Sequence, residues 1–463
     1  MAESKPYNDI EIDTLMAQDP VVAFQMSLFN MNPINPFQNI RKDPKTITFI
    51  DLFAGIGGVR KGLELAIEEF GYKPKCLFTS EIKKHAIKVL HQNNPNEVVF
   101  GDITQIPASI IPDFDILCAG FPCQAFSYAG KRLGFEDTRG TLFFDVERIL
   151  IEKRPKGFIL ENVEGLVNHD GGKTFKIIIN HLNAAGYNVS YKILNSKDFG
   201  LAQDRKRIYI VGSLKKAPDL EDFVISHATL SSILESNRPV DKSEFIQLLL
   251  SKYALKDLYG KSIKDKRGGN DNIHSWDLEM RGTVSDKQKQ LLNMMLKERR
   301  KKKWAERYGI EWMDGMPLTE DFIREFFDDE NLHDMLLDLT TKGYLTYEHP
   351  KKVITNPVRQ RVQDKTLPKG YNIVAGKLSF EVSKILDPND IAPTLVAMDM
   401  QRIFVPDNGG IRHLTIREGL RLFGYPESFT MNIPINDAYD LLGNTVAVPV
   451  IREVSKRLLN TIF

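Results

Sequence analysis

Residues 46–58 read TITFIDLFAGIGG, and they indicate the type of fold that the chain adopts. Residues 46–53 are rich in β-branched and apolar side chains, which is typical of a buried strand. Three glycines follow, and helical apolar spacing then runs from Val59 to Phe70. We interpret the stretch as a strand, a glycine turn and a helix, in which the glycines let the backbone approach a ligand at the start of the helix.

Acidic residues at two further strand ends favour an adenosine-bearing cofactor. Residues 75–80 predict the next strand, and Glu81 follows it at the position where such folds bind ribose hydroxyls. Asp102 ends the next apolar segment and could accept a hydrogen bond from an adenine amino group. A nicotinamide site would need Gly-x-Gly-x-x-Gly, but Arg60 stands where the third glycine belongs, which disfavours a dehydrogenase.

A cysteine and a glutamate are predicted at the same edge of this sheet. Residues 114–119 predict a buried strand, and a glycine and a proline then break the pattern, so we expect Cys123 on a loop past the strand. Residues 156–160 predict another buried strand, which delivers Glu161 at its carboxyl end. A lone cysteine is more often a small buried apolar residue, but this loop setting favours a nucleophile beside an acid.

Two arginines precede the predicted strand 208–211. Alternation along a strand would send Arg205 and Arg207 to the same side. Such a run is usually a solvated basic face, but its place beside the other strand ends favours a role in the site. Both cations have the right sign to help a thiol, whose ordinary pKa is about 8.5, to become a thiolate.

The composition excludes several classes of protein, but it does not indicate what the protein binds. The 463 residues contain 62 Lys and Arg against 61 Asp and Glu, so any binding of nucleic acid must come from a local patch. Cys76, Cys118 and Cys123 include no Cys-x-x-Cys pair, which argues against a disulfide framework and against a zinc site. No secretory signal and no apolar run long enough for a membrane span is visible, so we expect a cytoplasmic location.

The alternation of predicted strands and helices along the sequence divides the chain into four parts. Residues 1–45 form an extension without an assigned function, and residues 46–213 form the first part of the main domain. This alternation stops in residues 214–405, where basic and glycine-rich loops indicate a second domain. It resumes in residues 406–463, which we expect to return to the main domain. A basic helical run at 297–304 suits either phosphate contacts or a plain solvated face.

Taken together, these stretches resemble the DNA cytosine-5 methyltransferases of bacterial restriction–modification systems. The resemblance rests on six motifs in family order: DLFAGIGG at 51–58, GFPCQ at 120–124, ENV at 161–163, Q-x-R-x-R at 203–207, LT-x-RE at 414–418 and GNTV at 443–446. The family often has serine where Thr445 stands and varies at Phe423, which are mild departures. The resemblance implies an α/β, Rossmann-like S-adenosylmethionine-dependent methyltransferase fold with a smaller inserted target-recognition domain.

The resemblance also implies the chemistry. Cys123 would attack C6 of a cytosine that has left the duplex, and Glu161 would protonate N3, so that C5 accepts a methyl group from S-adenosylmethionine. Asn162 would hold the cysteine loop. Arg207 would bind the cytosine O2, and Arg205 would support the same pocket.

The resemblance to the family also implies which residues bind the cofactor and the DNA. The cofactor would be bound by Phe53, Gly55, Ile56, Gly57, Gly58, Glu81, Ile82, Asp102, Ile103, Pro122, Leu142, Asn444 and Val446. The DNA would be bound by Gln124, Ser127 and Thr394. The implied partner is double-stranded DNA, with a cognate restriction endonuclease acting separately, and the expected enzyme is a bacterial cytoplasmic monomer without a metal.

Two other interpretations stay open at this point. A tRNA cytosine-5 methyltransferase of the same lineage would have a compact recognition region, whereas the length of 214–405 suits a reader of duplex sequence. A catalytically silent DNA-binding regulator would keep the fold, but intact Cys123, Glu161 and Arg207 count against it. The recognised base sequence is not predicted.

Overall fold

The computed structural model of the chain divides into two compact units. It describes residues 44–122, 142–265, 271–312, 315–355, 359–374, 380–397 and 400–463. Unit 1 combines the described residues up to Leu234 with Asn389–Met400 and Thr415–Phe463, and unit 2 combines Glu235–Pro388 with Gln401–Leu414. These bounds follow contacts and differ from the expected functional bounds at 213 and 405, which stay a prediction.

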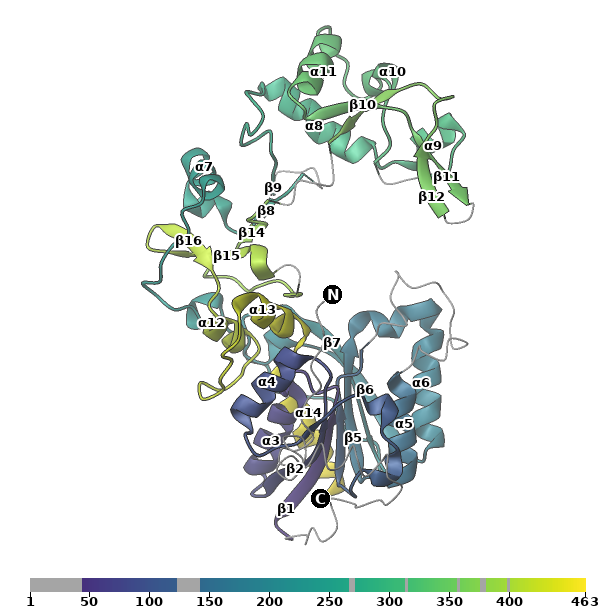
Figure 1. The fold of residues 1–463 in the computed structure, drawn as a ribbon, viewed down its shortest axis with the longest axis vertical. Coiled ribbons are helices and arrows are strands. Elements are labelled where there is room, and N and C mark those ends of the chain that lie inside the picture. Colours follow the sequence, from purple (N-terminus) through teal and green to yellow (C-terminus); the bar gives the residue numbers. More distant parts are fainter. Residues whose placement is uncertain are drawn as a thin grey trace, which may run out of the picture. The chain divides into compact units, whose positions relative to one another are not determined.

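A seven-stranded sheet forms the centre of unit 1, in the order β3-β2-β1-β4-β5-β7-β6 (Figure 1). The strands are β1 Thr46–Leu52, β2 Lys73–Ser80, β3 Val99–Phe100, β4 Ile116–Ala119, β5 Gly157–Val163, β6 Asn188–Asn195 and β7 Lys206–Ser213. Neighbours among β1 to β5 pair in parallel, whereas β7 pairs antiparallel with both β5 and β6. The predicted Rossmann-like α/β fold is confirmed.

Helices cover both faces of this sheet (Figure 1), which explains why β1, β4 and β5 are buried along almost their whole length. The helices of unit 1 are α3 Gly58–Glu69, α4 Lys84–Asn93, α5 Leu142–Lys153, α6 Lys173–Ala184, α12 Ile416–Leu422, α13 Ile435–Asn444 and α14 Val448–Ile462. Val146 of α5 and Ile178 of α6 pack in one apolar core with Leu160 of β5. Leu63 of α3 and Ile451 of α14 pack in the core of the opposite face.

The last helix of the chain packs on the first helix of the sheet domain. A Cβ at Gly62 would lie 2.5 Å from the Cβ of Ile451 and 2.9 Å from the carbonyl oxygen of Val448. Only a glycine lets α3 and α14 approach so closely. The C-terminal residues therefore complete the same unit that the first strand begins.

Strand β5 is longer than the sequence predicted. Its antiparallel ladder with β7 continues to the pair of Val163 and Arg207, so Glu161 and Asn162 lie inside the strand rather than after it. Strand β7 begins at Lys206. Arg205 therefore precedes the strand, and the alternation used to place it does not apply.

The described residues of unit 2 form two large apolar cores and a small third cluster of Ala305, Tyr308 and Met316. One core joins α7 to a five-stranded sheet in the order β16-β15-β14-β8-β9, and the other joins α8 and α11 to β10 and β13. The helices are α7 Glu244–Lys252, α8 Asp286–Glu298, α9 Lys302–Tyr308, α10 Glu320–Arg324 and α11 Leu332–Thr341. The strands are β8 Ser262–Ile263, β9 Asn272–Ile273, β10 Leu345–Glu348, β11 Lys351–Thr355, β12 Arg359–Gln363, β13 Gly370–Ile373, β14 Lys384–Ile385, β15 Ile403–Asp407 and β16 Gly410–His413.

The basic run at 297–304 is not one helix, and in this respect the prediction is wrong. Helix α8 ends at Glu298 and α9 begins at Lys302. Between them the buried Arg299 donates to the side-chain oxygen of Asn372 at 2.6 Å. Trp304 is fully buried, and its indole N–H donates to the carbonyl of Glu298. Arg299 and Trp304 thus stabilise the core of unit 2.

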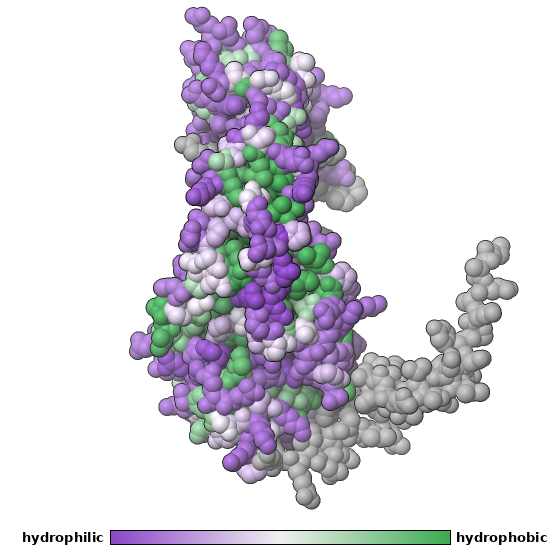
Figure 2. All heavy atoms as spheres, turned by 90° about the vertical axis from the view of Figure 1, so that its left-hand side faces the viewer, coloured by the Kyte–Doolittle hydropathy of each residue, from purple (hydrophilic) through white to green (hydrophobic). Residues whose placement is uncertain are grey.

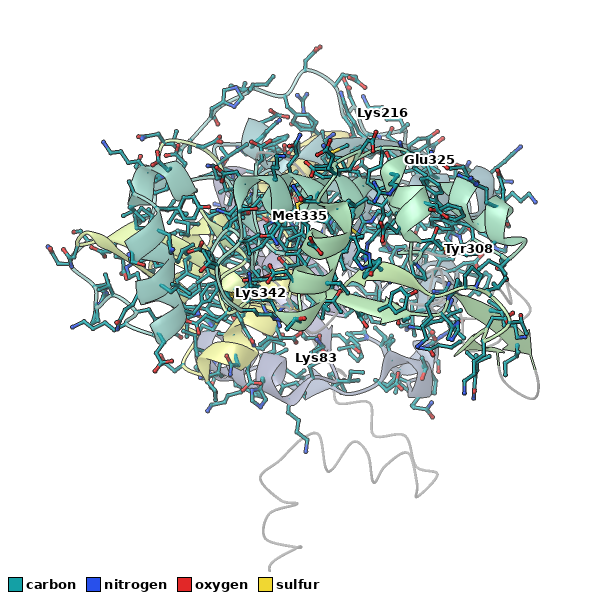
Figure 3. The ribbon with its side chains drawn as sticks, turned by 90° about the horizontal axis from the view of Figure 1, so that it is seen from above. Lys83, Lys216, Tyr308, Glu325, Met335 and Lys342 are labelled. Carbon is teal, nitrogen blue, oxygen red and sulfur yellow. The ribbon has the colours of Figure 1, made fainter. Side chains whose placement is uncertain are left out.

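The surface mixes polar and apolar side chains. Hydrophilic residues cover much of the face seen in Figure 2, with smaller apolar patches between them. Lys83 lies at the periphery in Figure 3, where its ammonium pairs with Asp440 at 2.9 Å. No helix among the described residues is long and apolar enough to cross a membrane.

Candidate active site

The turn after β1 needs glycine for two different reasons. Gly55 and Gly57 have φ angles of 56° and 81°, in the left-handed region that favours glycine, and Gly57 caps the start of α3. Phe53 adopts the same region with a φ of 55° although it carries a side chain. At Gly58 the reason is space, because a Cβ there would lie 2.7 Å from the hydroxyl of Tyr425. The turn therefore exposes backbone rather than side chains at the start of the helix.

Glu81 ties the ends of β1 and β2 together. Its Oε2 accepts from the backbone N–H of Gly55 at 2.6 Å, and its Oε1 accepts from the N–H groups of Ile82 and Lys83 at 2.8 Å each. A carboxylate has about four acceptor positions, so one stays available for a hydroxyl donor. Glu81 thus both shapes the turn and can still bind a ligand.

The ends of β2 and β3 lie side by side at the same edge. The N–H of Glu81 donates to the carbonyl of Phe100 at 3.0 Å. Asp102 is exposed just beyond β3, and its carboxylate accepts from the N–H of Thr104 at 3.0 Å. Ile82 is an apolar side chain that is 68% exposed. The carboxylate of Asp102 and the apolar side chain of Ile82 therefore flank the glycine turn that follows β1.

The other predicted cofactor residues differ in what they can offer. The side chains of Ile56, Ile103 and Val446 are buried, so only their backbone could reach a ligand. Pro122 is exposed after β4, Leu142 is half-buried at the start of α5, and Asn444 is exposed at the end of α13. The amide of Asn444 donates to the carbonyl of Asp440 at 2.8 Å.

Glu161 and Arg207 form a buried ion pair between β5 and β7. The Nε of Arg207 lies 3.2 Å from Oε1 of Glu161, and the two side chains are 12% and 10% exposed. Burial raises the pKa of Glu161, and the positive charges of Arg207 and Arg205 counteract part of that rise. A Cβ at Gly120, just past β4, would lie 3.7 Å from Oε2 of Glu161, so the end of β4 faces this carboxyl.

Asn162 fixes the backbone that follows β4. Its side-chain N–H donates to the carbonyl of Phe121 at 2.9 Å, and its oxygen accepts from the N–H of Val163 at 2.8 Å. Phe121 stands two residues before Cys123. Three predicted site residues, Cys123, Gln124 and Ser127, lie outside the described residues, as does most of the predicted extension 1–45.

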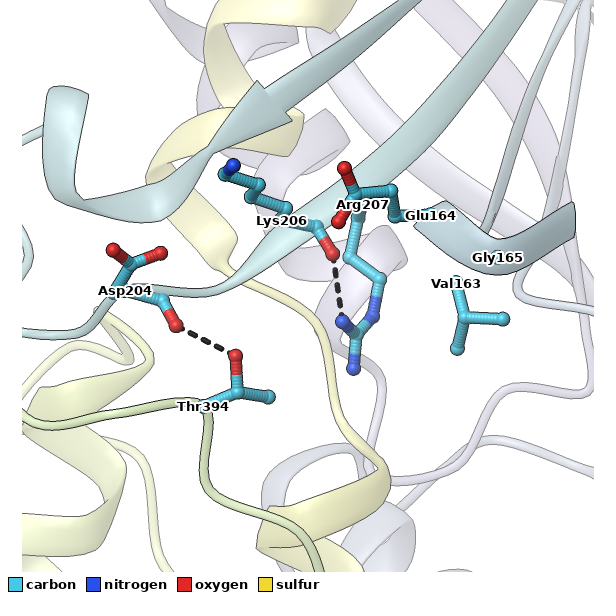
Figure 4. Close-up of a pocket in the computed structure, with 7 residues that line it drawn as sticks. All are labelled: Val163, Glu164, Gly165, Asp204, Lys206, Arg207 and Thr394. Carbon is cyan, nitrogen blue, oxygen red and sulfur yellow. Dashed lines mark hydrogen bonds between the residues drawn. The ribbon is translucent and has the colours of Figure 1, made fainter. Parts of the chain in front are cut away.

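A polar cavity of about 430 Å³ opens beside this ion pair (Figure 4). Its lining residues are Val163, Glu164, Gly165, Asp204, Lys206, Arg207 and Thr394. The hydroxyl of Thr394 donates to the carbonyl of Asp204 at 2.6 Å, and Arg207 donates to the carbonyl of Lys206 at 2.7 Å. Glu164, Asp204 and Lys206 were not predicted as site residues, although Glu164 follows the ENV motif and the other two lie inside the Q-x-R-x-R motif.

Arg205 and Arg207 have different hydrogen-bond partners, although the charges of both act on Glu161. The expected role of Arg205 in the same pocket stays a prediction. The guanidinium of Arg205 donates to the backbone carbonyls of Leu395, Gly443 and Thr445. Arg207 contacts Glu161 instead. Arg205 stands one residue before β7, and these carbonyls hold its side chain.

Asp51 is a buried group to which the sequence analysis gave no role. It pairs in register with Thr79 of β2 and Cys118 of β4, and its exposure is 0%. Neither carboxylate oxygen has a hydrogen-bond partner among the described residues. Burial raises its pKa to about 8, and the nearby charge of Arg60 opposes that rise. Its position inside the DLFAGIGG motif was the available signal. Among the described residues, no cluster suited to a metal ion occurs.

The fold is that of a Rossmann-like α/β protein with a buried acid close to a polar cavity, and comparison with known proteins gives its family. Residues 47–460 match the model of the C-5 cytosine-specific DNA methylases. The chain belongs to this family, so the resemblance based on six motifs is confirmed, and the protein is a DNA cytosine-5 methyltransferase.

Named relatives cover almost the whole chain. The Type II methyltransferase M.NlaIV of Neisseria lactamica is 62% identical over 423 residues, which are 90% of this chain and 99% of that protein. The Type II methyltransferase M.NgoBV of Neisseria gonorrhoeae is 60% identical over the same shares. Among solved structures, an E. coli prophage protein described as a DNA modification methyltransferase has 21% identity and a TM-score of 0.50, covering 90% and 99% of the two chains. That last likeness concerns the fold alone.

Proposed function

We propose that this enzyme methylates C5 of cytosine at one duplex sequence through a transient bond between Cys123 and C6. The observation that carries the proposal is the ion pair of the buried Glu161 with Arg207, which itself lines the polar cavity. The relatives named above are Type II methyltransferases. On that basis we assign to the enzyme the protection of host DNA against a cognate restriction endonuclease that acts separately, inside a bacterial cytoplasm.

The family implies S-adenosylmethionine as methyl donor, and the residues after β1, β2 and β3 fit that molecule. The open backbone at Gly55 suits its methionine end, the remaining acceptor position of Glu81 suits a ribose hydroxyl, and Asp102 suits the adenine amino group. The exposed side chain of Ile82 would cover the adenine ring. When bound, S-adenosylmethionine supplies a methyl group on a sulfonium that readily accepts electrons from a nucleophile.

The protein groups make the cytosine ring nucleophilic at C5. The thiolate of Cys123 forms a bond to C6 while Glu161 gives a proton to N3, so the electron pair of the C5–C6 double bond becomes available at C5. After C5 has gained the methyl group, loss of its proton re-forms the double bond and expels the thiolate. The proton on N3 then returns to Glu161.

The same cavity accounts for binding of an extruded base. C6 is stacked between neighbouring bases in duplex DNA, so the nucleotide must leave the helix before a thiol can reach it. Arg207 would donate to the cytosine O2, and Thr394 with Lys206 would face the DNA backbone at the rim. We assign the reading of the base sequence to unit 2, which corresponds largely to the expected recognition domain 214–405.

The proposal is tested by incubating the purified protein with labelled S-adenosylmethionine and either mixed-sequence duplex DNA or bulk tRNA. We expect 5-methylcytosine in the DNA alone, and Cys123→Ala should abolish it while leaving DNA binding largely intact. Label in tRNA alone would favour the RNA-modifying alternative, and label in neither would favour a silent regulator. Bisulfite sequencing of DNA from expressing cells would identify the recognised sequence.

A further inference from the structure

Arg205 is a buried cation whose partners are backbone carbonyls rather than carboxylates. It is 3% exposed, and it donates from Nη1 to Leu395 at 2.9 Å and from Nη2 to Thr445 at 2.7 Å and Gly443 at 3.2 Å. Its guanidinium also lies over the ring of Phe423, 5.2 Å from the centroid. The planar fork of arginine suits such a multiple contact, and a lysine could not reproduce it.

The three carbonyls belong to segments with different proposed ligands. Leu395 follows Thr394, which lines the polar cavity proposed for DNA. Gly443 and Thr445 flank Asn444, which is proposed to bind the cofactor. A single side chain therefore connects the segment on the DNA side to the segment on the cofactor side.

These two segments are also in direct backbone contact. A Cβ at Gly443 would lie 2.1 Å from the backbone nitrogen of Ala397, so only glycine allows this approach. Thr445 continues the connection, because its hydroxyl lies 2.6 Å from that of Tyr425. Both hydroxyls would contact a Cβ placed at Gly58, in the turn proposed for the methionine end.

We propose that Arg205 is a positioning residue that couples cofactor binding to DNA binding. The inference rests on the proposed function. A bound cofactor that fixes the turn at Gly58 would also fix the position of Thr445. Through its hydrogen bonds to Thr445 and Leu395, Arg205 would then fix the backbone at the rim of the cavity. Coupling between two sites can pass through a contiguous network when both ligands favour the same arrangement of it, and these contacts form such a network.

The test measures binding of the duplex that bisulfite sequencing identifies, with and without saturating S-adenosylhomocysteine, by fluorescence anisotropy. In the parent enzyme we expect S-adenosylhomocysteine to tighten DNA binding by at least about fivefold, the low end of typical coupling. In Arg205→Lys this factor should fall below about twofold. Arg421→Lys is the matched control, since Arg421 also donates to a backbone carbonyl, that of Ile233, but lies outside the network, and its factor should equal the parent's.

If Arg205 had only a structural role, Arg205→Lys would weaken the binding of DNA and of S-adenosylhomocysteine separately and would leave the coupling factor unchanged. That result would overturn the proposal. An absence of coupling in the parent enzyme would overturn it as well. If Arg205→Lys does not fold, Tyr425→Phe decides, because it removes the bond to Thr445 and should lower the same factor. Failure of the proposed function would look different, since no DNA would then be methylated by the parent enzyme.

Discussion

The carboxyl of Glu161 and the guanidinium of Arg207 meet at 3.2 Å across the antiparallel ladder of β5 and β7. Glu161 lies two residues before Val163, the residue that pairs with Arg207. Residues two apart on a strand point to the same face, so the ladder itself positions the pair. Burial raises the pKa of Glu161, and Arg207 limits that rise. An acid with a raised pKa holds a proton nearer neutral pH, as donation to N3 requires.

Replacement of Glu161 by glutamine removes the proposed proton donor with little change in shape. We expect single-turnover methyl transfer to slow by about 10²–10⁴-fold, the usual contribution of a positioned acid. Glu164→Gln is the matched control, because Glu164 lines the same cavity but is exposed and has no such partner role in the proposal. A rate for Glu161→Gln equal to the parent's would place the acid elsewhere.

Replacement of Arg207 by methionine should move the pH dependence of methyl transfer. Because the charge of Arg207 lowers the pKa of Glu161, its loss raises that pKa further. The protonated acid then persists to higher pH, so the decline in single-turnover rate on the alkaline side should shift upward, whatever the drop in overall rate. Lys206→Met removes an adjacent cation and should leave the position of that decline unchanged. A shift to lower pH in Arg207→Met would contradict the assignment.

The bond from Asn162 to Phe121 should matter for both stability and rate. Asn162→Ala leaves the carbonyl of Phe121 without this donor, which should cost about 1–3 kcal/mol in the free energy of unfolding. Methyl transfer should slow as well, since Cys123 follows Phe121 by only two residues in the sequence. Urea unfolding and single-turnover kinetics measure the two effects. Asn188→Ala is the control, because its side chain makes only a long contact of 3.4 Å to Ser213. Equal behaviour of both variants would rule out the proposed restraint.

Asp51 should make stability depend on pH. Its pKa is about 8 in the folded protein against an ordinary value of 3.8, so the folded state keeps a proton that the unfolded chain releases between these values. Raising the pH through this window therefore lowers the free energy of unfolding, by about 1.4 kcal/mol per pH unit from this group. In urea unfolding between pH 5 and 8, the free energy of unfolding of Asp51→Asn should depend less on pH than that of the parent. Asp113 is exposed, and Asp113→Asn should show the pH dependence of the parent. Identical slopes for Asp51→Asn and the parent would contradict the assignment.

The close approach of α3 and α14 gives a prediction about the C-terminal residues. Gly62→Ala places a methyl group against Ile451 and the backbone of Val448, so the helices must separate. Overpacking of this kind typically costs about 1–3 kcal/mol, which thermal unfolding would show as a lower Tm. Gly101→Ala meets nothing within 4 Å and should keep the parent's Tm. A Gly62→Ala variant as stable as the parent would mean that α14 does not pack here.

The sheet and its site could be predicted from the sequence because they depend on local signals. Apolar runs ending in Gly55, Glu81 and Asp102 marked successive strands, and the structure brings those ends to one edge. Arg205 could not be placed in this way. Its direction depends on carbonyls 190 and 240 residues away along the chain, which no local pattern reveals.

The same limit applies to Arg299 and Asp51. Arg299 reads as part of a solvated basic helix, but a break in the helix turns it toward Asn372, 73 residues further on. In the sequence, Asp51 is one residue of the motif that contains the glycine turn. Its burial depends on β2 and β4, which pair with β1 on either side. Local periodicity predicts elements, whereas the partners of a buried charge are set by tertiary packing.

Covalent capture of the enzyme on a 5-fluorocytosine duplex shows whether the sulfur of Cys123 bonds to C6. Parent enzyme and Cys123→Ser are incubated with S-adenosylmethionine and a long duplex in which every cytosine is 5-fluorocytosine, so that any recognised sequence is present. Fluorine at C5 cannot leave as a proton would, so the bond between sulfur and C6 should persist. We predict a denaturation-resistant protein–DNA adduct that peptide mass spectrometry assigns to Cys123, and none with Cys123→Ser. Methylation of ordinary cytosine without such an adduct would contradict the account.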